Sequence, residues 1–143
     1  MVDASFSNVN RAYQRAFEGL LGNVRNEGVL ELAGDLAAYE AEAENGSKLF
    51  CAVDTEHVIR GARYANAPDS VQQALLEGLC GIIVGMPIQE CNDHGVIRLE
   101  HELRDRTVPA PVAGVVTPLS ADQAFGPVLA LCRDLYRQYL DRT

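Results

Sequence analysis

The chain is short of positive charge and of long hydrophobic runs. Twelve Lys and Arg residues stand against twenty Asp and Glu, which gives a formal net charge of −8. Because binding to a phosphate backbone depends mainly on Lys and Arg, we expect no nucleic-acid partner. The longest apolar run, residues 79–88, is broken by glycine and proline and is far shorter than the ~20 residues that span a bilayer. We therefore expect no contact with a membrane.

The sequence also lacks a secretory signal and any Cys-x-x-Cys pair. Its first residues are polar, without the basic start and apolar stretch of a signal peptide, so we expect a cytoplasmic protein. Thiols stay free in that reducing compartment. The four cysteines are far apart in sequence, unlike those of a zinc finger or a redox motif.

Apolar material is sufficient for one core. At 143 residues and 48% hydrophobic, the chain can bury one sizeable core and is too short to suggest two. We expect a single domain over residues 1–143.

Alternating residues predict a three-stranded antiparallel meander. Residues 39–44 alternate between apolar side chains and glutamates and lead to Asn45-Gly46, the dipeptide typical of a type I′ hairpin turn. Two further strands are expected at residues 49–53 and 58–65. Because Ala and Glu also favour helix, residues 36–44 could instead be helical, and only the turn residues favour the strand.

Helices are predicted at both ends of the chain. The first begins at a Ser7 N-cap and ends at Gly22. The last covers residues 125–139 as a clean apolar stripe, with Pro127 in its first turn because an interior proline would remove a hydrogen bond.

A long helix is predicted to follow the strands. Asp69 and Gln72 form a start that resembles a capping box, and the helix continues to about residue 84. From residue 91 to residue 106 we expect a polar loop and then a short helix, although residues 96–97 could also begin a strand.

These elements together predict an α+β fold in which a three-stranded antiparallel meander carries helices packed on one face. Cys51, Cys80 and Cys132 fall on the apolar sides of their elements. A thiol in that position packs as a small hydrophobic group. Cys91 lies in the predicted polar loop and is the exception.

The strongest local candidate for chemistry is Cys91-Asn92-Asp93-His94. A thiolate and an imidazole three residues apart in a loop could share a metal ion or act as nucleophile and base. A loop histidine beside an aspartate is more often an ordinary surface residue. The sequence has no glycine-rich phosphate loop and no nucleophile elbow, so we expect that the protein is not an enzyme.

The order of the elements and four short stretches resemble the NifU/IscU family of iron–sulfur cluster scaffolds and the related sulfur acceptor SufE. The stretches match the family's Arg-Asn-x-Gly, its third strand, its Gly-Lys-Ser after the long helix and its Leu-Pro-Pro-Val. Here they read Arg25-Asn26-Glu27-Gly28, Gly61-Ala62-Arg63-Tyr64, Gly85-Met86-Pro87 and Pro109-Ala110-Pro111-Val112. The resemblance covers most of the chain and implies a SufE/NifU-like fold.

The cluster ligands that the resemblance implies are missing. Family scaffolds place cysteines in the first hairpin turn, at the start of the long helix and after the proline segment, where this chain has Asn45, Asp69 and Val116. Iron–sulfur clusters require thiolates, so a standard cluster is not expected. An atypical iron or zinc site would use Asp69 with Cys91 and His94.

The functional expectation combines this resemblance with these departures. We expect a scaffold-like protein of iron–sulfur cluster assembly with degenerate ligand positions, acting in metallocentre assembly through a protein partner or through the atypical metal site. The alternative is a non-catalytic adaptor or accessory subunit that uses the fold as a protein-binding surface. An enzyme built on Cys91, Asp93 and His94 is a third hypothesis.

Overall fold

The computed structural model describes residues 6, 9–117 and 120–142 and has an α+β fold. Its strands are β1 (Ala37–Glu42), β2 (Lys48–Val53) and β3 (Ile59–Ala65), which form one antiparallel sheet in the order β1-β2-β3. Its helices are α1 (Arg11–Leu21), α2 (Ser70–Ile83), α3 (Ile88–Leu103) and α4 (Gly126–Asp141). The predicted three-stranded meander is confirmed.

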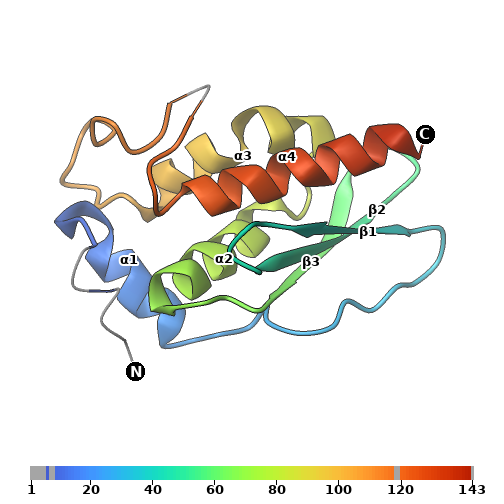
Figure 1. Ribbon diagram of the computed structural model, residues 1–143, viewed down its shortest axis with the longest axis horizontal. Coiled ribbons are helices and arrows are strands. Elements are labelled where there is room, and N and C mark those ends of the chain that lie inside the picture. The colour runs from blue at the N-terminus through green and yellow to red at the C-terminus, as the bar shows by residue number, and fades with distance from the viewer. Residues whose placement is uncertain (1–5, 7–8, 118–119, 143) are drawn as a thin grey trace.

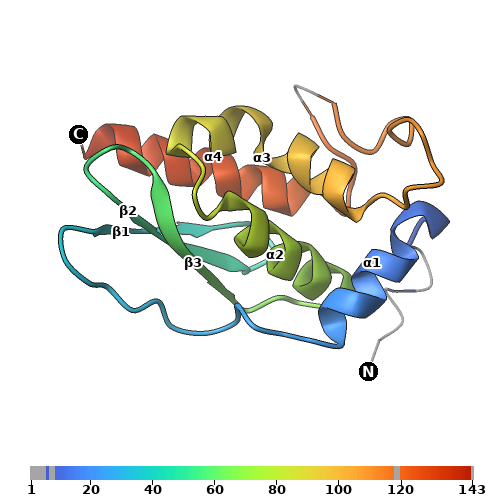
Figure 2. The same cartoon turned by 180° about the vertical axis from the view of Figure 1, so that it is seen from behind.

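The helices cover one face of the sheet, as predicted. Along β1 the side chains of Tyr39 and Ala41 are buried beneath the helices, whereas the glutamates between them are exposed. Figures 1 and 2 show α2 and α4 lying along this face, with α3 packed behind them and α1 across one end. The irregular segment 29–36 crosses the opposite face, where a Cβ atom at Gly61 would be only 3.1 Å from Leu30 Cδ1. The core therefore sits between the sheet and the helices.

The β1–β2 turn occurs where it was predicted but is not of type I′. That type requires positive φ at both central residues, and here Gly46 has φ +89° while Asn45 does not adopt positive φ. The Asn45 side chain instead accepts hydrogen bonds from the backbone N–H and the hydroxyl of Ser47, at 3.0 and 2.6 Å. The turn thus uses an Asx interaction followed by one left-handed glycine.

Helix α1 begins later than predicted. Asn10 is its N-cap, since its Oδ1 accepts the backbone N–H of Ala12 at 2.9 Å, and Gly22 ends the helix as expected. The predicted cap Ser7 lies outside the described residues. Helix α4 begins at Gly126 with Pro127 in its first turn, which confirms the prediction for that helix.

The prediction of a polar loop at Cys91 is wrong, because α3 is one continuous helix over this region. Its buried residues recur every three or four positions and form one face, namely Ile88, Cys91, Gly95, Val96, Leu99, Glu100 and Leu103. The polar triplet 92–94 forms the solvent side of the same turns. The three polar residues at 92–94 obscured the helical spacing of the apolar residues on either side.

No helix among the described residues is long and apolar enough to cross a bilayer.

Candidate functional site

The four cysteines converge in the core. Cys51 on β2, Cys80 on α2, Cys91 on α3 and Cys132 on α4 are each at most 1% exposed. Electrostatic interactions on Cys51, Cys80 and Cys132 come from one another and from Cys91, which places the four sulfur atoms in one region of the core. Gly95 lies between two of them, because a Cβ atom at that position would be 3.5 Å from the Cys91 sulfur and 3.7 Å from the Cys132 sulfur.

Three of these thiols, Cys51, Cys80 and Cys132, have raised pKa values that favour the neutral form. Burial raises the pKa of Cys51 and Cys80 well above the usual value. A hydrogen bond with Cys91, together with burial, raises the pKa of Cys132. Because the thiolate is both the nucleophile and the metal ligand, these three thiols are poorly suited to either role in the folded protein.

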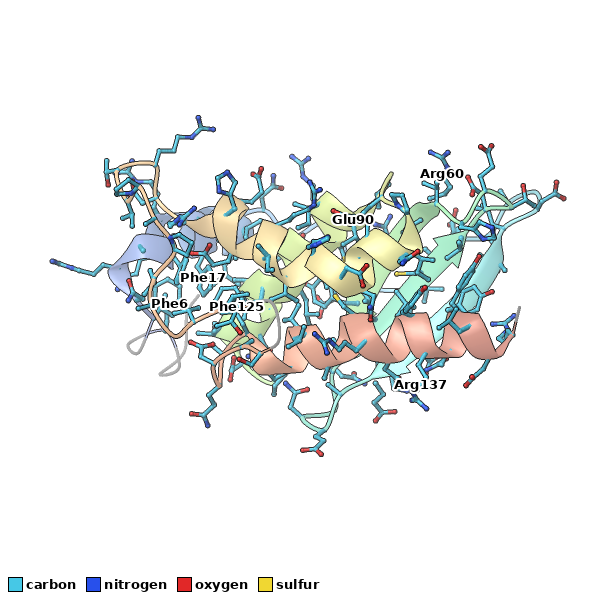
Figure 3. All side chains as sticks on the ribbon, turned by 90° about the horizontal axis from the view of Figure 1, so that it is seen from above. Phe6, Phe17, Arg60, Glu90, Phe125 and Arg137 are labelled. Atoms are coloured by element: carbon cyan, nitrogen blue, oxygen red, sulfur yellow. The ribbon has the colours of Figure 1, made fainter. Side chains whose placement is uncertain are left out.

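Cys91 and His94 do not form a nucleophile and base. The Cys91 thiol points into the core toward Cys132, while His94 is exposed on the outer face of α3. The His94 Nδ1 atom bonds Oε1 of Glu90 at 2.8 Å, and Arg98 binds the same carboxylate at 2.7 Å (Figure 3 labels Glu90). The two bonds lower the pKa of Glu90. The imidazole thus belongs to a surface ion-pair network.

Asp69 lies at the opposite end of α2 from the turn that leads into α3. Its Oδ1 atom accepts the backbone N–H of Gln72 at 2.8 Å, so the predicted N-cap is confirmed. A helix of this length spans about 20 Å, which separates Asp69 from Cys91 and His94. Over residues 6, 9–117 and 120–142 no group of three His, Cys, Asp or Glu side chains is arranged to hold a metal ion. The structure therefore does not bring Asp69, Cys91 and His94 together.

The positions that the family resemblance implies as ligands have structural roles here. Asn45 is used in the hairpin turn and Asp69 in the cap of α2. Val116 pairs with Ala121 in an isolated antiparallel bridge. An amide, a helix-capping carboxylate and an aliphatic side chain do not fit an iron–sulfur cluster, whose ligands are thiolates.

A cavity of about 580 Å³ lies beside Asp69, between α1, the start of α2 and the segment that leads into α4. Its floor is aromatic, formed by Tyr13, Phe17 and Phe125, and Figure 3 shows the two phenylalanines together at this end of the molecule. Acidic and amide side chains also line it, from Asp69, Gln72 and Asp122. The cavity therefore combines an apolar floor with hydrogen-bond acceptors.

Gln72 is the unusual member of this set. The residue is only 6% exposed, and its Nε2 atom donates to the Ala124 carbonyl oxygen at 2.8 Å. Its Oε1 atom is buried and has no hydrogen-bond partner. The sequence analysis assigned Gln72 to a capping box, in which its side chain would return to the backbone of Asp69, but the side chain reaches across to Ala124 instead.

Two buried carboxylates were not predicted from the sequence. Glu77, 3% exposed, accepts hydrogen bonds from the backbone N–H groups of Arg25 and Asn26 and from the Tyr64 hydroxyl, at 2.8–3.0 Å. Glu100, also 3% exposed, accepts the Tyr13 hydroxyl at 2.8 Å. Polar residues on otherwise apolar helix faces were the available signal.

The comparisons with known proteins give little further identification. No family model and no curated protein matches the chain. Among solved structures, the crystal structure of the N-terminal part of a nitrogen-fixing NifU-like protein from Brucella abortus is similar, with a TM-score of 0.44 and 17% sequence identity. The match covers 92% of this chain and 81% of that one. Similarity at this level does not assign the chain to a family.

Proposed function

We propose that the protein acts in iron–sulfur cluster or other metallocentre assembly through contacts with a protein partner, and that it carries no cluster on its own thiolates. The resemblance of its motifs to the NifU/IscU family motivates the first part. The observation that carries the second part is the burial of all four sulfur atoms in the core. On this proposal the fold is retained while the cluster chemistry is lost, and the protein is not an enzyme.

Ligand chemistry supports this separation of fold and cluster. Cluster ligands must be deprotonated, and the raised pKa values of three thiols oppose that. The carboxylate of Asp69 is engaged in capping α2, and His94 is paired with Glu90. One carboxylate and one imidazole far apart in the structure do not replace the missing thiolate ligands.

Anaerobic reconstitution tests the cluster part of the proposal. The wild-type protein is incubated with iron, sulfide and a cysteine desulfurase and then examined by visible absorption and metal analysis. We expect a colourless, iron-free protein. A brown, iron-containing wild type would overturn the proposal.

A triple variant provides the positive control. Asn45→Cys, Asp69→Cys and Val116→Cys together place thiols at the three positions that the resemblance implies. If the resemblance is correct, this variant acquires visible absorption under conditions in which the wild type stays colourless. A folded triple variant that also stays colourless would contradict the resemblance.

The protein contact is tested by co-purification from the source cells, with the partner identified and its stoichiometry measured by light scattering. A stoichiometric complex with a protein of metallocentre assembly supports the proposal. A strictly monomeric protein without a partner would count against it.

A second candidate function is an adaptor outside metallocentre assembly. The observation that favours it is the exposed apolar segment that crosses the open face of the sheet, where Val29 is 86% and Leu32 is 52% exposed. Exposed apolar side chains on one segment are typical of protein-binding surfaces. A stoichiometric partner unrelated to metal chemistry would favour this candidate.

A further inference from the structure

We propose that the cavity lined by Asp69, Gln72 and Asp122 binds an organic cation that has N–H donors and an apolar stem. The chemical class is an alkylammonium or alkylguanidinium group. Two sources carry this chemistry, a free small amine or a Lys or Arg side chain of a partner. The inference stands apart from the assembly role, since it uses no thiol and no metal.

The Oε1 atom of Gln72 is buried and has no hydrogen-bond partner. Buried amide oxygens are normally hydrogen-bonded, and each exception requires an explanation. The Gln72 amide cannot correct the defect by flipping, because Oε1 would then face the Ala124 carbonyl oxygen, which is another acceptor. Because Gln72 lines the cavity, a ligand N–H group is a candidate partner for Oε1.

Two carboxylates near Gln72 give the cavity negative charge. Asp69 and Asp122 are half-buried and line the same cavity. Asp69 Oδ1 caps α2 by accepting the N–H of Gln72 at 2.8 Å, and Asp122 Oδ1 accepts the N–H of Phe125 at 2.9 Å in the turn before α4. The second oxygen of each carboxylate therefore remains as an acceptor. Ionised carboxylates accept only, so the complementary ligand is a cationic donor.

The floor of the cavity is aromatic. The rings of Tyr13 and Phe125 meet edge to face with centroids 5.6 Å apart, and Phe17 stacks on Tyr13 at 6.3 Å. The three rings are largely covered by one another, and what they present to the cavity is an apolar surface suited to an alkyl stem. The Tyr13 hydroxyl is directed to Glu100 and so leaves the cavity floor apolar.

An anion is the competing ligand, because α1, α2 and α4 all begin near this cavity. Helix starts attract anions through their unpaired N–H groups. Here side-chain oxygens of Asn10, Asp69 and Asp122 already accept such groups. The amides of Asn10 and Gln123 also line the cavity, but its two charged side chains, Asp69 and Asp122, are both carboxylates, which favours a cation.

The test is a titration of the isotope-labelled full chain followed by amide NMR. The probes are n-butylguanidinium and its neutral analogue n-butylurea, which has nearly the same shape. We expect saturable shifts at the Gln72 side-chain amide and at Ala124 with n-butylguanidinium. We expect n-butylurea to bind at least about tenfold more weakly, because it lacks the charge-assisted bonds.

Matched charge variants locate the interaction. Asp122→Asn keeps an oxygen that can accept the Phe125 N–H but removes the charge. We expect its affinity for n-butylguanidinium to fall about tenfold. Asp93→Asn removes the same charge from the exposed face of α3, outside the cavity wall, and should leave the affinity unchanged. An equal effect of the two variants would overturn the assignment of the site.

A peptide arm separates the two sources of the cation. An alanine peptide with one central Arg is compared with the same peptide carrying citrulline. Tighter binding of the Arg peptide than of n-butylguanidinium supports a partner's side chain, and weaker binding supports a free amine. The proposal is overturned if n-butylguanidinium produces no saturable shift at the cavity, if n-butylurea binds as tightly, or if inorganic phosphate saturates the site instead.

Discussion

The two halves of α2 each bury a polar side chain, and the two are treated in opposite ways. In the C-terminal half, Glu77 receives three hydrogen bonds to one oxygen and a fourth, from the Asn26 side chain at 3.0 Å, to the other. In the N-terminal half, Gln72 donates one bond and leaves its oxygen unpaired beside a cavity.

The two buried polar residues of α2 thus have different roles, one in the fold and one that we assign to ligand binding. Glu77 links the segment after α1 to α2 and to Tyr64 of β3 through hydrogen bonds. Its carboxylate is therefore fully used in stabilising the fold. The neighbouring Cys80 joins the sealed group of thiols in the same half. Gln72 retains binding capacity that the fold does not use. The satisfied Glu77 has a structural role, whereas the unsatisfied Gln72 oxygen requires an explanation, for which we propose a ligand.

The largest effect is expected from removing Glu77. Glu77→Ala leaves the N–H groups of Arg25 and Asn26 and the Tyr64 hydroxyl without their acceptor. We expect the free energy of unfolding to fall by about 3 kcal/mol or more, measured by urea denaturation. Glu102→Ala, at an exposed position on α3, serves as the control and should change it by less than about 0.5 kcal/mol. A loss below about 1 kcal/mol for Glu77→Ala would remove the contrast with Gln72.

The next largest effect is expected from alkaline pH, which should lower the free energy of unfolding through the buried thiols. The folded state keeps Cys51, Cys80 and Cys132 protonated because their pKa values are raised, whereas the unfolded chain ionises them above roughly pH 8.5. The stabilisation is therefore fully present below that pH and is lost as pH rises. Each thiol contributes a slope of up to about 1.4 kcal/mol per pH unit.

The slope is measured by urea denaturation between neutral pH and about pH 10. Cys132→Ala should reduce it by the contribution of one thiol, and comparing slopes removes the packing cost of the substitution. Tyr13 and Tyr64, whose pKa values are also raised by burial, remain in both proteins and cancel. A stability that is flat across this range would contradict the sealed thiols.

Alanine substitutions at two glycines of α2 test how tightly each face of the helix is packed. A Cβ atom at Gly81 would meet nothing within 4 Å, so Gly81→Ala should gain about 0.5–1 kcal/mol from helix propensity alone. At Gly78 the Cβ atom would lie 3.0 Å from Leu99 Cδ1 and 3.4 Å from both Leu103 and Leu20. We expect Gly78→Ala to be less stable than Gly81→Ala by about 1 kcal/mol or more. Equal thermal midpoints would indicate that the Glu77 end of the helix is loosely packed.

The smallest effect is expected at Gln72. Gln72→Met removes the unpaired oxygen at the cost of the bond to Ala124, and these contributions oppose each other. We expect a change in the free energy of unfolding of less than about 1 kcal/mol. A loss comparable with that of Glu77→Ala would mean that Gln72 is a structural residue.

Local signals predicted the strands and most helix ends. Alternation identified the sheet, and residues with a backbone role, such as Asp69 and Gly22, identified the helix limits. The turn type at Asn45 was beyond this reasoning, because a side-chain bond to Ser47 decides it. Cys91 was misplaced because three polar residues follow it, and only the packing of α3 against α4 reveals that they face solvent.

The candidate site was the least predictable part. Sequence proximity suggested that Cys91 and His94 act together, but the helix turns one inward and the other outward. The Gln72–Ala124 contact joins residues 52 positions apart, a separation that no local pattern indicates. The spacing of residues in a motif thus indicates which of them share a helix face. Whether a polar atom is left without a hydrogen-bond partner depends instead on residues that are distant in sequence.

Thiol alkylation is the most direct test of the claim that all four sulfur atoms are sealed in the core. The native protein is treated with iodoacetamide at neutral pH and the adducts are counted by mass spectrometry, in parallel with a sample in urea. The account predicts no adduct in the native protein and four in the unfolded one. Rapid alkylation of Cys91 or Cys132 in the native protein would contradict it.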